Sequence, residues 1–254
     1  MTGGPLNGTV ASLTSRSLLG RRRTFVLLLL PVALLGICTL ARILGSLDGD
    51  IARNLDGPLS ADLLGAFGLA ILMPLLSLIA GTGAIGPEID EGSIVYLLAK
   101  PINRHSIVLT KLLVALVVVV TFGVVPIAVA GEVVTGEIGV VTLAFTLGSL
   151  AAGVAYSSLF LLLAVVTRNA VVVGLVYALV WESLVGGLVP GAQALSVQQW
   201  STAIVQQVLG DSAGLMGVDA AVGLGAALVM LVLVTVAATF YAGRRLQTLR
   251  ITEA

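Results

Sequence analysis

Long apolar runs constrain the fold of this chain more than any other feature of its sequence. A helix needs about 20 mostly apolar residues to cross about 30 Å of hydrocarbon. Runs of this kind occupy residues 24–46, 61–86, 107–130, 139–166, 170–189 and 218–241. Charged residues make up only 10% of the 254 positions, against about 25% in a soluble protein. The sequence therefore predicts an all-α integral membrane protein with about six transmembrane helices in a single domain, residues 1–254.

The basic residues predict the orientation of these helices, because Lys and Arg are retained on cytoplasmic flanks. With the N-terminus inside, all of the 13 basic residues except Arg42 and Arg53 fall on cytoplasmic segments. Both termini are thus predicted to be cytoplasmic. The basic residues are spread over several membrane flanks instead of one face, so nucleic acid is not an expected partner.

Two segments outside the apolar runs have helical patterns of their own. Residues 1–23 carry Leu6, Val10 and Leu13 at helical spacing, which predicts a helix lying on the cytoplasmic leaflet, with a disordered tail as the alternative. The outer segment 190–216 places four apolar side chains on one stripe, which predicts a short helix at the outer surface or partly re-entrant. These are Val197, Trp200, Ile204 and Val208. The short helix could gate a pathway, dock an external partner or only cap the bundle.

The connection between the second and third runs, residues 87–105, is short, charged and amphipathic. It begins with Pro87 followed by acidic residues, which suit the first turn of a helix. It ends with Lys100 just before Pro101, a typical helix stop. An apolar stripe lies between these ends, formed by Ile94, Leu97 and Leu98. On the cytoplasmic side, such a helix offers a soluble partner something to bind.

Several residues in and after this connection match a family pattern: Glu91-Gly92-Ser93, Leu97-Leu98, Lys100-Pro101-Ile102, Arg104 and Lys111. They resemble the first cytoplasmic loop of type 2 ABC-transporter permeases, and the chain is similar to the permease of nitrous-oxide-reductase maturation systems. Trp181-Glu182, Val189-Pro190-Gly191 and Gln199-Trp200 are also similar to members of this family. The chain departs from the family pattern at His105-Ser106, where an aromatic-acidic pair is common.

The resemblance implies that 87–105 carries a coupling helix, which fits a groove in a separate ATPase. The expected ATPase-binding residues are Glu88, Asp90, Glu91, Ser93, Tyr96, Lys100 and Arg104. The sequence has no G-x-x-x-x-G-K-[ST] phosphate loop, so we expect ATP and Mg to be bound by the partner and this chain to hold no cofactor, no metal and no catalytic residue. The other expected partners are a second permease copy in a homodimer, membrane lipid and an extracytoplasmic protein.

The resemblance also implies a function and a location. We expect a permease subunit of an ABC transporter that couples ATP hydrolysis to export, or to force transmission, across a prokaryotic plasma (inner) membrane. Two other classes stay open: an intramembrane enzyme, and a passive channel or scaffold that works without ATP. Glu88 and Glu91 lie one helical turn apart near His105, but these three residues make an incomplete metal or acid–base site.

Glu182 is the acidic residue that the apolar runs leave unexplained. It lies about twelve residues into the fifth run, or about 18 Å along a helix, and an ionisable group at that depth is costly to solvate. It could line a pathway, bind a cationic group, or pair with a basic residue such as Arg42 near the outer end of the first run. The alternative is that it reaches the outer interface and caps the bundle.

Overall fold

The computed structural model describes Thr14 and residues 21–55, 57–90, 104–185 and 191–248. These residues form helices and connecting loops without a strand. The long helical segments are α2 (Arg21–Leu47), α4–η1–α5 (Pro58–Asp62, Leu63–Leu72, Met73–Asp90), α7–η2–α8 (Arg104–Val119, Val120–Val124, Val125–Thr135), α9 (Val140–Val166), α10–η3 (Ala170–Val176, Tyr177–Val185) and α14 (Leu224–Thr248). The shorter elements are α3 (Gly49–Leu55), η4 (Ala192–Leu195), α12 (Val197–Leu209) and α13 (Ser212–Leu215).

The length and composition of these helices fit a membrane protein. In the described part of the chain, 5 helices are long and apolar enough to cross a membrane. They are Leu27–Leu47, Pro58–Ile89, Arg104–Thr135, Val140–Val166 and Leu224–Gln247. A shorter apolar helix, Ala170–Glu182, covers part of the fifth apolar run. The predicted class, an all-α integral membrane protein, is confirmed.

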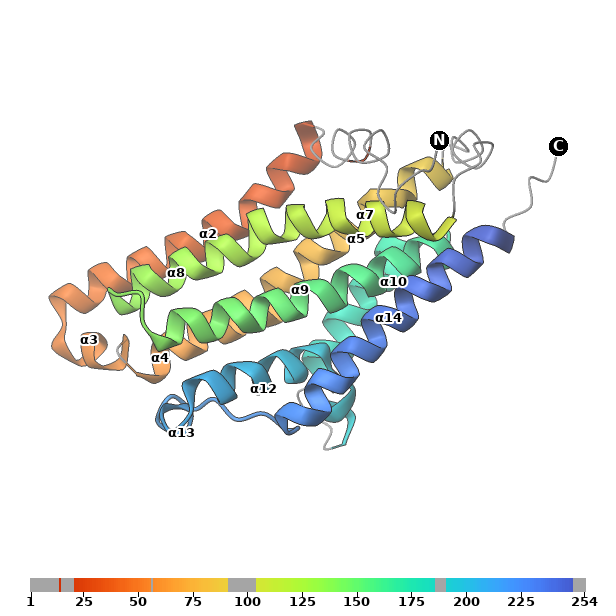
Figure 1. Ribbon diagram of the computed structural model, residues 1–254. Helices are drawn as coiled ribbons and strands as arrows, with labels where there is room; N and C mark the ends of the chain where they lie inside the picture. Colours follow the sequence, from red (N-terminus) through yellow and green to blue (C-terminus); the bar gives the residue numbers. More distant parts are fainter. Residues whose placement is uncertain (1–13, 15–20, 56, 91–103, 186–190, 249–254) are drawn as a thin grey trace.

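Helix α9 lies at the centre of the bundle and packs against α5, α8, α12 and α14 (Figure 1). Its small and aromatic side chains are buried along most of its length. By contrast, α14 leaves many large apolar side chains exposed, including Val229, Val232 and Val236. An exposed apolar face of this kind suits contact with lipid, because the core of the bilayer holds no water.

The last helix begins later than the apolar run 218–241 suggests. Two glutamine side chains of α12 hold the preceding loop: Gln206 Oε1 accepts a hydrogen bond from the Ala220 N–H at 3.0 Å, and Gln199 Oε1 accepts one from the Ala221 N–H at 3.1 Å. Gly217 precedes this loop with a φ of 67°, in the left-handed region that favours glycine. Helix α14 therefore begins at Leu224.

Two wide π-helical segments come just before prolines in the spans. Segment η1 ends at Leu72, two residues before Pro74, and η2 ends at Val124, two residues before Pro126. Proline lacks the N–H that continues the helical ladder, and π-helical turns commonly accompany such interruptions. Pro31, in contrast, lies inside an uninterrupted α2.

Figure 1 shows which loops share an end of the bundle. The end of α5, the start of α7, the α9–α10 turn and the end of α14 lie together at one end. The α3–α4 region, the α8–α9 turn and α13 lie toward the other. The predicted orientation makes the first end cytoplasmic.

Helix α5 approaches the backbone of α9 closely at Gly81. A Cβ atom there would lie 3.0 Å from the carbonyl oxygen of Ser157 and 3.1 Å from the backbone nitrogen of Leu161. These are backbone atoms of a packed helix, so they cannot move aside as a flexible side chain does. Small residues at such crossings allow membrane helices to pack through their backbones.

We predict that Gly81→Ala lowers the free energy of unfolding by about 1–3 kcal/mol, because the added methyl group forces α5 away from α9. Thermal unfolding of the full chain in detergent measures this effect. Gly86→Ala is the matched control, since it lies on the same helix and a Cβ there would meet nothing within 4 Å. Equal melting temperatures for the two variants would contradict the close packing.

Candidate functional site

A buried lysine joins the two helices that flank the connection 87–105. The side chain of Lys111, on α7, has no exposed surface. Its ammonium group donates hydrogen bonds to Glu88 Oε1 at 2.7 Å, to the Ala84 carbonyl at 2.7 Å and to Thr14 Oγ1 at 3.4 Å. Glu88 and Ala84 belong to the last turns of α5.

These three acceptors match the three donors of an ammonium group. A buried charge is costly unless it is paired and hydrogen-bonded, and the carboxylate of Glu88 supplies the opposite charge. The ion pair therefore fixes the end of α5 against the start of α7. The Thr14 hydroxyl lies at the same point as a hydrogen-bond acceptor.

The end of α14 packs on the start of α7. The His105 ring stacks on Phe240, with 5.6 Å between ring centroids, and its Nε2 lies 3.4 Å from Gln247 Nε2. The guanidinium of Arg244 lies 5.3 Å from the centre of the Phe240 ring, within cation–π range. At His105, where the sequence departs from the family pattern, the structure thus places a contact with the last helix.

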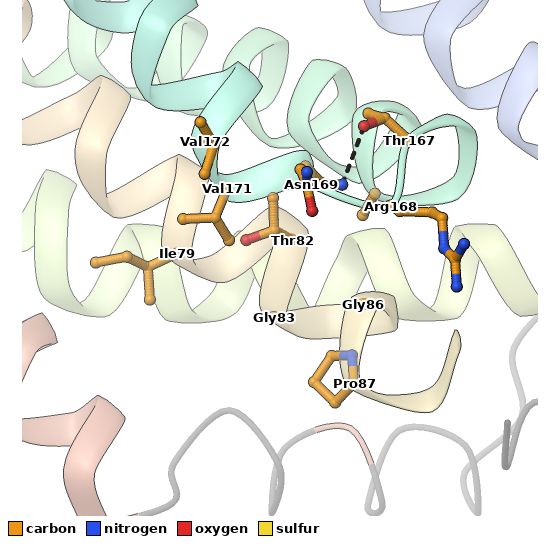
Figure 2. Close-up of a pocket in the computed structure, with 12 residues that line it drawn as sticks. Ile79, Thr82, Gly83, Gly86, Pro87, Thr167, Arg168, Asn169, Val171 and Val172 are labelled. Atoms are coloured by element: carbon orange, nitrogen blue, oxygen red, sulfur yellow. Dashed lines mark hydrogen bonds between the residues drawn. The ribbon is translucent and has the colours of Figure 1, made fainter. Parts of the chain in front are cut away.

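A pocket of about 500 Å³ lies between the last turns of α5 and the α9–α10 turn (Figure 2). Thr82 and Pro87 line it on the α5 side, and Thr167, Arg168 and Asn169 line it on the other. Residues from two connections far apart in the sequence therefore share one surface at this end of the bundle.

The structure describes only part of the predicted ATPase-binding set. Glu88 is partly buried and pairs with Lys111. Arg104 begins α7, and its Nη1 atom is buried with no hydrogen-bond partner among the described residues. The backbone of Asp90 ends α5. The remaining members of the set lie outside the described residues: Glu91, Ser93, Tyr96 and Lys100.

Glu182 is 2% exposed and lies where α12 begins. Its carboxylate accepts hydrogen bonds from the Tyr177 hydroxyl at 2.9 Å, from the Ser196 hydroxyl, and from the N–H groups of Val197 at 3.0 Å and Gln198 at 3.4 Å. Ser196 also accepts a hydrogen bond from the Gln199 N–H at 3.3 Å, as an N-cap residue. The carboxylate therefore caps α12 and ties it to the fifth apolar segment.

Arg42 and Glu182 are not brought together. Arg42 Nη1 donates a hydrogen bond of 3.3 Å to the Val134 carbonyl near the end of α8, where the helix dipole favours a cation. The donors around Glu182 come instead from η3 and from the start of α12. The Arg42 guanidinium thus finds its hydrogen-bond partner at the end of α8, and the Glu182 carboxylate finds partners at the start of α12.

The sequence reasoning missed Lys111 as an anchor and Ser196 as a cap. Lys111 lies within the apolar run 107–130, and an ionisable residue inside an apolar run is the signal that could have marked it. Ser196 precedes the apolar stripe of α12, which is the usual place for an N-cap residue. Neither signal identifies the acidic partner, which comes from a different helix.

These features define a multi-pass helical membrane protein in which an ion pair joins the helices α5 and α7 at one end of the bundle. A family model described as ABC-2 family transporter protein matches residues 13–242. Because this match covers most of the 254 residues, the chain belongs to the ABC-2 transporter family and is a type 2 ABC-transporter permease. Membrane subunits of this family work with ABC ATPase partners and are generally not catalytic themselves. A search of curated proteins finds no match.

We predict that Glu182→Gln loosens α12, because the amide turns an NH₂ group toward donors that the carboxylate oxygens satisfied. Hydrogen bonds to a charged group contribute about 1.5–3 kcal/mol each. Hydrogen exchange at the backbone N–H groups of residues 197–209 should therefore speed up by about tenfold or more. Hydrogen–deuterium exchange with mass spectrometry measures it. Glu132→Gln, at an exposed position on α8, is the control. Unchanged exchange in the Glu182 variant would show that the carboxylate does not hold α12.

Proposed function

We propose that this chain couples ATP hydrolysis by a separate ABC ATPase to export, or to force transmission, across the plasma membrane of a prokaryote. The observation that carries the proposal is the buried Lys111–Glu88 ion pair at the base of the connection 87–105. It supports a coupling role because it fixes both helices that flank this connection. A displacement of the connection then moves α5 and α7 together.

The packing of α5 supplies a route for that movement into the bundle. At Gly81 its backbone approaches the backbone of α9 closely, and α9 in turn contacts α8, α12 and α14. Packed helices transmit displacement because close-packed interiors have low compressibility. ATP-driven closure of the ATPases would in this way convert an inward-open arrangement to an outward-open one.

Arg104 is the described residue that best suits direct contact with the ATPase. Its side chain is partly exposed and begins α7, directly after the connection. A carboxylate of the partner would bind this guanidinium through parallel hydrogen bonds, the paired geometry that arginine favours. Glu91, Ser93, Tyr96 and Lys100 complete the proposed contact surface, with Asp90 at its edge. Glu88, which faces Lys111, acts as the anchor of that surface.

The working assembly that we propose contains two permease copies, in a homodimer, and two ATPases that bind ATP and Mg. Lipid surrounds the apolar faces, and an extracytoplasmic protein is the recipient if force is transmitted. Helix α12, held by Glu182, would be the element that faces such a protein.

We predict that Arg104→Gln reduces co-purification with the ABC ATPase encoded nearest to this gene, because a charge-assisted contact is lost. A drop of about tenfold in the apparent affinity corresponds to one such contact. Arg53→Gln is the control, since Arg53 forms an exposed ion pair with Asp50 on α3. Equal recovery of the ATPase with both variants would rule Arg104 out as a contact.

We predict that the double variant Glu88→Leu/Lys111→Met keeps the fold and the bound ATPase but lowers the ATP hydrolysis rate of the complex. Replacing both members of a buried pair by apolar residues is often tolerated, whereas Lys111→Met alone strands a charge at a cost of about 3–5 kcal/mol. Melting temperature, ATPase recovery and phosphate release are measured on the same preparation.

The exposed pair provides the matched control, Asp50→Asn/Arg53→Gln, which should leave all three measurements unchanged. Wild-type ATP hydrolysis in a folded Glu88/Lys111 double variant would mean that the ion pair does not contribute to coupling. Failure to recover any ATPase with the wild-type chain would overturn the proposed function itself.

A further inference from the structure

The pocket between α5 and the α9–α10 turn has walls of two chemical kinds. Its rim is polar and is formed by Thr167, Arg168 and Asn169, whereas Ile79, Val171 and Val172 form an apolar wall. Figure 2 shows these two groups on either side of Thr82. The pocket is therefore amphipathic along its length.

Arg168 gives the polar rim its charge. Among the residues that the structure describes, it takes part in no ion pair, and its side chain is exposed. Figure 2 shows the guanidinium extending from the α9–α10 turn toward the last turn of α5. A guanidinium binds phosphate oxygens through parallel hydrogen bonds, which makes arginine the favoured side chain for phosphate recognition.

The apolar wall of the pocket continues onto the exposed face of α10. Val171 is 58% exposed and Val172 is 62% exposed, and both lie in an apolar helix. In a membrane, side chains at such positions contact acyl chains. The pocket thus connects a lipid-facing surface to a cationic group at the cytoplasmic interface.

We propose that this pocket binds an anionic phospholipid of the cytoplasmic leaflet, with its phosphate on Arg168 and its first acyl methylenes against Val171 and Val172. Basic pockets between transmembrane helices on the cytoplasmic side are typical places for anionic headgroups. A volume of about 500 Å³ lies within the range of small-molecule sites, about 300–1,000 Å³. It holds a headgroup and leaves most of the acyl chains in the bilayer.

The lipid site does not depend on the coupling function proposed above. It needs only the predicted orientation, which places Arg168 on the cytoplasmic side. Gly86 and Pro87 also line the pocket, so a bound headgroup would lie beside the end of α5 that Lys111 anchors.

The test is native mass spectrometry of the full chain from nanodiscs of phosphatidylcholine with and without phosphatidylglycerol. The wild-type chain should retain phosphatidylglycerol in preference to phosphatidylcholine, and Arg168→Gln should retain about tenfold less of it, as expected for one lost charge-assisted contact. Arg168→Lys, which keeps the charge, should retain an intermediate amount.

Gly86→Leu tests the pocket without changing any charge, since a Cβ at Gly86 would meet nothing within 4 Å and the side chain can grow into the cavity. It should also lose the retained lipid, while the control Arg53→Gln should not. Lipid retention by Arg168→Gln equal to wild type would overturn the proposal. Retention of inorganic phosphate by the wild-type chain to the same extent as phosphatidylglycerol would assign the pocket to a free anion. Loss of dimer mass instead of lipid mass would assign this face to a second copy.

Discussion

Hydrocarbon offers no hydrogen bonds, so every polar group that the helices carry into the membrane needs its partner within the protein. The backbone meets this requirement by forming helices. Ionisable side chains need special arrangements, and the structure shows two of them. Lys111 is surrounded by three acceptors near the end of α5, and Glu182 by donors where α12 begins. Each arrangement joins two helices across the connection that separates them in the chain.

The fold class could be predicted from the sequence because membrane insertion depends on composition over a span, which is a local property. The positions of the long helices follow for the same reason. The start of α14 could not be predicted in this way, since two glutamines of α12 hold the residues before Leu224 by hydrogen bonds across the fold. Apolar composition records nothing about such contacts.

The candidate site was predictable only in part. The charge pattern and the family resemblance both drew attention to the connection 87–105, and depth in the fifth run drew attention to Glu182. The roles of individual residues needed the tertiary structure. Glu88 looked like a partner-facing acid but pairs inward with Lys111, and Glu182 had Arg42 as a candidate partner but caps a helix instead. A side chain's partner depends on which helices meet, and local sequence does not encode this directly.

The cap on α12 also sets an order of events during synthesis. Glu182 precedes Ser196 by 14 residues, and the chain grows from its N-terminus. The fifth apolar segment therefore enters the membrane ahead of Ser196, Val197 and Gln198, which supply the donors to its carboxylate other than the Tyr177 hydroxyl. Until they follow, Glu182 has only the Tyr177 hydroxyl as a partner in apolar surroundings, where an ionisable group is costly. Docking of α12 therefore stabilises the fifth apolar segment in its inserted position.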